Sequence, residues 1–118
     1  MRRAAGAILP LEASILLAAA ALGREGDPEF HGFAMAKRLR DVDTARRLTA
    51  HGTLYKALGR MEAAGLLASR WEDPNLAADE GRPRRRLYRI TGAGTSALAA
   101  LDVEAARRAG GAAGLAPT

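Results

Sequence analysis

The sequence predicts a mainly helical domain with a small β wing, and three observations favour this architecture. Apolar residues recur three and four positions apart in the first half of the chain, which is typical of helices with one buried side. Two strand-like runs follow, 66–71 and 86–90, separated by a charged segment rich in turn residues. A last helical stripe begins after Thr91, a good N-cap. This order of elements is typical of a winged helix-turn-helix: three helices, two strands joined by a wing, and a further helix.

Composition limits the possible functions. The 118 residues are enough for one compact domain and an extra helix for pairing. A formal net charge of +5 favours polyanionic partners, above all nucleic acid. There is no cysteine and there are only two histidines, so we expect no disulfide, no metal site and no cofactor. Without a catalytic grouping or a phosphate-binding glycine loop, the sequence does not indicate an enzyme.

The first helix is predicted at 10–22, after an arm formed by residues 1–9. Pro10 is well tolerated at the first position of a helix. The basic start and apolar run of 8–22 also resemble a secretory signal peptide. Against that alternative, Glu12 interrupts the run, and the run is shorter than the roughly 20 residues needed to span a bilayer.

The next segment, 23–32, contains three glycines and a proline and reads as a loop. A second helix is expected at 33–42, with Phe33 among its inward residues. His31 precedes this helix, and we expect it to cap the helix or to hold the turn rather than to bind a ligand.

A helix from Gly52 to Ala64 is the most informative feature of the sequence. Its apolar side consists of Leu54, Ala57, Leu58, Met61 and Ala64. Thr53, Lys56 and Arg60 occupy the opposite side, and Gly65 stops the helix. A buried back and a narrow cationic front are typical of a helix that enters the major groove of DNA.

Three residues near the start of this helix are predicted to support its binding to DNA. His51 and Thr53 lie at the end whose free amide groups favour a phosphate. Tyr55 flanks the cationic side, where its hydroxyl can meet the DNA backbone while its ring packs on the domain. The alternative for Tyr55 is a half-buried core aromatic residue.

The wing carries the densest positive cluster of the chain, and its members are Arg82, Arg84, Arg85 and Arg86. Arginine in a wing can enter the minor groove or contact phosphates. Because side chains alternate along a strand, Arg84 and Arg86 are expected to face away from Arg85. Two or three of the four should meet DNA, and the others should pair with nearby acids. These acids are Asp73, Asp79 and Glu80. Trp71 is expected to be a packed strand aromatic residue.

Three segments together resemble the PadR family of transcriptional regulators: HGFAMAKRL (31–39), GTLYKALGRMEAAGLL (52–67) and GRPRRRLYRITGAG (81–94). With the terminal helices, the resemblance covers 8–108 and is closest to the compact branch with a single C-terminal helix. The sequence departs from the family pattern in a longer loop before His31 and in lacking a proline before Gly52. The resemblance implies a homodimeric regulator, commonly a repressor, that can release DNA when a small effector binds.

The two terminal helices also predict a homodimer, since a small domain offers little room to bury both. The residues assigned to the dimer contact are Leu11, Ile15, Leu22, Leu98, Leu101 and Ala105. The expected division is a DNA-binding domain at 10–90, a dimerisation helix at 91–108 and a disordered tail at 109–118. Two recognition helices would then face successive major grooves of a palindromic operator.

The sequence therefore predicts a cytoplasmic repressor that binds double-stranded operator DNA and no membrane. The alternative is a winged-helix module that binds another protein without specific DNA recognition, because a fold does not determine a function. Insensitivity to changes at Thr53, Lys56 and Arg60 would favour that alternative.

Overall fold

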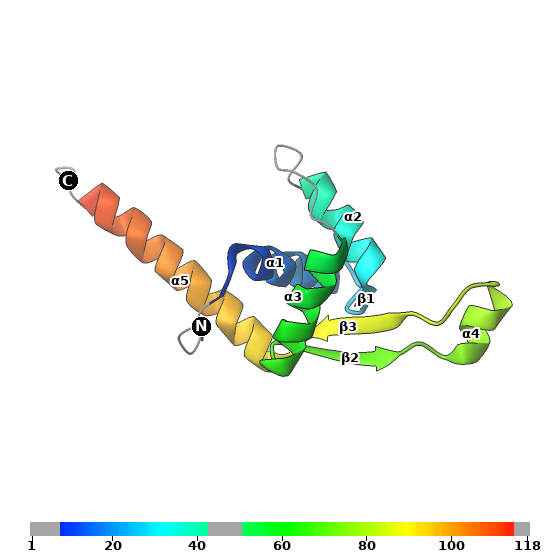
Figure 1. The fold of residues 1–118 in the computed structure, drawn as a ribbon. Helices are drawn as coiled ribbons and strands as arrows, with labels where there is room; N and C mark the ends of the chain where they lie inside the picture. Colours follow the sequence, from blue (N-terminus) through cyan, green and yellow to red (C-terminus); the bar gives the residue numbers. More distant parts are fainter. Residues whose placement is uncertain (1–7, 43–50, 115–118) are drawn as a thin grey trace.

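The computed structural model describes residues 8–42 and 51–114. In chain order the elements are α1 (Pro10–Arg24), β1 (Phe30–His31), α2 (Gly32–Val42), α3 (His51–Ala63), β2 (Leu67–Trp71), α4 (Pro74–Asp79), β3 (Arg86–Ile90) and α5 (Gly92–Gly114). The helices α1, α2 and α3 lie together beside the sheet, and the wing and α5 extend from this body in opposite directions (Figure 1). This is the predicted helical domain with a small β wing.

The core forms where the first three helices meet the sheet. Ile15 and Leu16 of α1, Met35 of α2, Leu58 of α3 and Leu67 of β2 are all completely or almost completely buried. The apolar sequence of α1 is compatible with burial in the domain core or between two subunits. In the structure, α1 packs against α2, α3, α5 and β3 of its own chain.

Local hydrogen bonds set where α1 and α2 begin. The backbone N–H of Leu9 donates to Oε1 of Glu12 at 3.1 Å, which satisfies an amide just before α1. At α2, the N–H of Ala34 donates to Nδ1 of His31 at 3.3 Å. The prediction that His31 caps the second helix is therefore confirmed.

The sheet has three antiparallel strands in the order β1-β3-β2. The sequence predicts a loop at 23–32, but Phe30 and His31 form β1, where Phe30 pairs with Tyr88. Their rings stack with centroids 5.9 Å apart, and both residues are buried. A strand of two residues has no periodicity from which it could have been predicted.

The predicted stop at Gly65 is confirmed by its backbone. Gly65 has φ of 81°, a left-handed conformation that glycine adopts without strain. Its N–H donates to the carbonyl of Glu62 at 3.0 Å, and the N–H of Leu66 donates to that of Met61 at 2.9 Å. This pair of bonds is the Schellman arrangement that ends a helix and turns the chain into the next element. Ala64 lies beyond α3 and is exposed, so its assignment to the buried side was wrong.

The start of α5 is held by Thr91, as predicted. The N–H of Gly94 donates to Oγ1 of Thr91 at 3.0 Å, and that hydroxyl donates to the carbonyl of Gly65 at 2.6 Å. The helix continues past Arg108, where the sequence analysis ended it, to Gly114. Within the described residues, no helix combines the length and apolarity needed to cross a membrane.

Candidate nucleic-acid interface

The two sides of α3 are those that its sequence predicts. Leu54, Ala57, Leu58 and Met61 are buried in the core. Thr53, Lys56 and Arg60 are exposed on the other side. The side chain of Lys56 is exposed and makes no ion pair with any described residue. The side chain of His51, the remaining residue predicted at this end of the helix, lies outside the described part of the structure.

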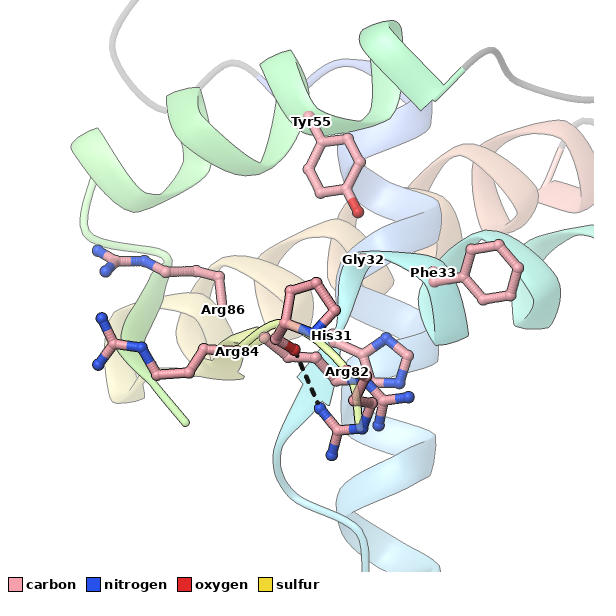
Figure 2. Close-up of a pocket in the computed structure, with 9 residues that line it drawn as sticks. His31, Gly32, Phe33, Tyr55, Arg82, Arg84 and Arg86 are labelled. Carbon is pink, nitrogen blue, oxygen red and sulfur yellow. Dashed lines mark hydrogen bonds between the residues drawn. The ribbon is translucent and has the colours of Figure 1, made fainter. Parts of the chain in front are cut away.

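Tyr55 joins the start of α3 to the start of α2. It is 45% exposed, and its ring lies against the backbone of Gly32 (Figure 2). A Cβ atom at Gly32 would come within 2.7 Å of the Tyr55 hydroxyl oxygen, so only glycine permits this contact. Tyr55 thus packs on the start of α2 and remains partly exposed.

Arg60 has a partner that the sequence did not reveal. Its Nε donates to Oε2 of Glu12 at 3.3 Å, which connects α3 to α1. The side chain of Glu12 is 1% exposed, whereas that of Arg60 remains 44% exposed. Arg60 therefore neutralises a buried carboxylate and also presents part of its side chain to solvent. The partners are 48 positions apart in the sequence, so no local pattern indicates the pair.

Arg82 stabilises the fold of the wing through hydrogen bonds to two glutamates. Its guanidinium donates to both carboxylate oxygens of Glu72, at 2.5 and 2.9 Å, and to Glu80 at 2.8 Å. The Arg82 guanidinium and a bond from the N–H of Arg85 lower the pKa of Glu72 to about 2. Such a bidentate pair is geometrically specific. Glu72 was not identified from the sequence as a functional residue, and its pairing leaves Arg82 little freedom to contact DNA.

Arg84 and Arg86 share a different environment. Their side chains point the same way in Figure 2, and their Cζ atoms lie 5.3 and 5.0 Å from the ring centroid of Trp71. Arg86 also approaches Glu62, with an Nη2–Oε2 distance of 3.7 Å. The predicted alternation of strand side chains accounts for their shared position. Trp71, expected to be packed, is instead 52% exposed and covered by these two arginines.

A pocket of about 350 Å³ lies between the start of α2, Tyr55 and the wing. Its lining residues are His31, Gly32, Phe33, Tyr55, Pro83 and the four arginines of the wing. Burial lowers the pKa of His31, and the charges of Arg85 and Arg82 lower it further. A lowered pKa favours the neutral imidazole, which the role of Nδ1 as a hydrogen-bond acceptor requires. The pocket places aromatic edges beside guanidinium groups at the junction between α3 and the wing.

The acids of the wing tip are part of its fold. Asp73 caps α4 by accepting the N–H of Asn75 at 2.8 Å, and Pro74 occupies the first turn. Asp79 ends this short helix, and Glu80 pairs with Arg82. This segment, predicted to be a turn-rich tip, contains the short helix α4, which was not predicted. An aspartate followed by proline was the available signal, since these residues favour the N-cap and the first helical position.

The residues predicted for the dimer contact differ in their availability. Ile15 is completely buried within its own chain, so it cannot contact a second copy, and this assignment was wrong. Leu11, Leu22, Leu98 and Leu101 are partly buried. Ala105 is exposed on α5, together with Val103, which is 56% exposed. The most accessible of the predicted contact residues is therefore Ala105, on α5.

Comparisons with known proteins agree with this geometry. The sequence model of the transcriptional regulator PadR-like family matches residues 22–100. A PadR family transcriptional regulator from Eggerthella lenta DSM 2243 shares 27% identity and a TM-score of 0.63, over 86% of this chain and 79% of that one. A PadR family transcription regulator from Clostridium difficile R20291 is 26% identical, with a TM-score of 0.59. The match covers 78% of this chain and 84% of that one.

A transcriptional regulator from Clostridium thermocellum is similar in fold, with 20% identity, a TM-score of 0.60 and coverage of 90% of this chain and 92% of that one. Among curated proteins, none matches the chain. The matched family consists of transcriptional regulators, not of enzymes.

Proposed function

Since the chain belongs to the PadR-like family of transcriptional regulators, we propose that it regulates transcription by recognising one DNA sequence through α3. The observation that carries this proposal is the exposed side of α3, where Thr53, Lys56 and Arg60 lie opposite a fully buried core side. A helix of 13 residues is about 20 Å long at roughly 1.5 Å per residue, enough to lie in the major groove.

The wing supplies the second contact in this proposal. Arg84, Arg85 and Arg86 have no bidentate carboxylate partner among the described residues, in contrast to Arg82. Guanidinium groups at this position can contact phosphates or the narrow minor groove, which positions the protein without reading bases. His51 and Tyr55 are proposed to contact the backbone near the start of α3.

A homodimer is the proposed binding unit. The helix α5 extends away from the body of the molecule (Figure 1), and Val103, Leu101 and Ala105 lie along it. An extended helix with exposed apolar residues gains stability by packing against its copy. Two-fold symmetry would then place two α3 helices on half-sites about 34 Å apart in a palindromic operator. The domain division at residue 90, with α5 as the pairing helix, belongs to this proposal.

The proposed regulatory effect is repression, because a dimer bound to an operator excludes other proteins from the same DNA. A small effector would release the dimer by favouring a conformation that cannot reach both half-sites. The protein would act in the cytoplasm, together with the DNA that it regulates.

The test is footprinting and quantitative binding on the DNA upstream of the protein's own gene. A protected palindrome supports both specific binding and the dimer. Lys56→Ala is expected to reduce the preference for this operator over random DNA about tenfold or more, because a base contact contributes about 1–3 kcal/mol of discrimination. Arg24→Ala removes the same charge from an exposed position at the end of α1, outside α3, the wing and α5, and should leave the preference unchanged.

Two outcomes would contradict the proposal. Equal affinity for operator and random DNA would remove sequence recognition. Full activity after changes at Thr53 and Lys56 would favour a protein-interaction module instead.

A further inference from the structure

Trp71 has an unusual environment for the largest aromatic side chain of the molecule. It ends β2 and lies opposite Arg86 in the strand register. About half of its surface is exposed, although neighbouring residues of the sheet such as Tyr88 are buried. Core packing therefore does not account for Trp71, and its contacts with the wing do.

Two cations lie over the same indole ring. The Cζ atoms of Arg84 and Arg86 are 5.3 and 5.0 Å from its centroid, within the range of cation–π attraction. Two guanidinium groups this close to one ring repel each other, and the negative ring face offsets that repulsion. Glu62 assists only Arg86, at 3.7 Å, and Arg84 has no carboxylate partner within the described residues.

Arg82 is held by carboxylates, whereas Arg84 and Arg86 lie against the ring of Trp71, and the two kinds of contact affect the arginine charge differently. Glu72 and Glu80 hold Arg82 but also neutralise its charge. The Trp71 ring restrains Arg84 and Arg86 and leaves their positive charge intact. Long side chains that are already restrained lose less conformational freedom when they bind a partner.

We propose that Trp71 is a positioning residue for DNA binding, which holds Arg84 and Arg86 as a paired cationic contact for the DNA backbone. This inference rests on the proposed function. Trp71 acts through the two arginines and does not itself contact the nucleic acid.

The first experiment measures the affinity of Trp71→Leu for a labelled duplex by fluorescence anisotropy at several salt concentrations. Its affinity is expected to fall about fivefold to tenfold, the effect of ordering two long side chains only on binding. The dependence of the logarithm of affinity on that of salt concentration should not change, because both charges remain. Arg84→Ala with Arg86→Ala should instead reduce this slope by roughly two.

Two controls separate positioning from folding. Trp71→Phe keeps an aromatic face and is expected to recover most of the affinity. Leu76→Ala removes another exposed apolar side chain of the wing, 47% exposed on α4, and should bind DNA as the wild type does. Thermal unfolding of each variant shows whether the fold is intact.

The deciding measurement is Trp71→Leu in the Arg84→Ala, Arg86→Ala background. There the tryptophan should no longer affect affinity, because the groups that it positions are absent. A loss that persists in this background contradicts the positioning role and indicates direct DNA contact or a folding effect. So does a Trp71→Phe variant as weak as Trp71→Leu.

Measurements on the wild type distinguish failure of the proposed function from failure of the positioning role of Trp71. If it shows no salt-dependent DNA binding, the proposed function fails and the role of Trp71 fails with it. If the wild type binds and Trp71→Leu binds equally well, only the positioning role is refuted.

Discussion

Replacing Arg60 with alanine should destabilise the folded protein, quite apart from any effect on DNA binding. Arg60 is a cationic partner of Glu12, with Nε and Oε2 3.3 Å apart, and Glu12 is almost completely buried. Without Arg60, a carboxylate in the interior of the protein loses a positive neighbour. The N–H of Leu9 still donates to it.

The structure sets the size of this effect between two limits. Removing one partner from a fully buried pair costs about 3–5 kcal/mol. An exposed pair contributes only about 0–1 kcal/mol, because water screens both charges. Since the Arg60 side chain is 44% exposed and Glu12 is buried, we expect a loss of about 1–2 kcal/mol in the free energy of unfolding. That corresponds to a decrease in Tm of roughly 5–10 °C for a domain of this size.

Urea unfolding followed by circular dichroism measures the loss. All samples need the same protein concentration, because the stability of a dimer depends on it. Lys56→Ala is the matched control: it removes a charge from the same helix but breaks no ion pair among the described residues, so it should change stability by less than about 0.5 kcal/mol. The Glu12→Gln change should make Arg60→Ala less costly. Equal stability of Arg60→Ala and Lys56→Ala would refute the reasoning.

Two further predictions concern the frame of the site. Gly94→Ala should lower the free energy of unfolding by about 1–3 kcal/mol, because the new Cβ would collide with the carbonyl oxygen of Leu66. Gly59→Ala, in open space on α3, should raise that free energy by about 0.5–1 kcal/mol. Urea unfolding of both variants measures the two changes, and changes of the same sign would contradict the prediction. The pKa of Glu72 in the folded protein is about 2, below its ordinary value of 4.5. The ionised carboxylate therefore stabilises the fold fully above pH 4.5, and this stabilisation is lost as the pH falls toward 2. Stability measured from about pH 6 to pH 2 should therefore decrease less steeply in Glu72→Gln than in the wild type, and equal slopes would show that the pair with Arg82 does not set the acid response.

The parts of the fold that could be predicted from the sequence depend on local signals. The buried side of α3 follows from helical spacing, and its end follows from Gly65, whose positive φ few other residues accept. The N-cap at Thr91 and the cap by His31 are also local, with each donor three residues from its acceptor. Periodicity and capping act over a few residues, so one sequence is enough to detect them.

The parts that were missed depend on contacts between distant segments. The strand β1 exists because Phe30 meets Tyr88, and its two residues carry no pattern of their own. The apolar helix α1 was compatible with burial in the core and with burial in a dimer. Only the packing of the other helices around Ile15 decides between these possibilities. Composition identified a buried helix but could not identify what buries it.

The charges of the wing show why a count of arginines overstates the surface offered to DNA. Arg82 is held by Glu72 and Glu80, so it stabilises the bend of the wing. The acids of the wing tip stabilise its fold: Asp73 caps α4 and Glu80 accepts a hydrogen bond from Arg82. Under the proposed function, Arg84 and Arg86 are among the wing cations left to contact DNA. The ring of Trp71 lies against both without neutralising them, whereas Glu62 approaches only Arg86.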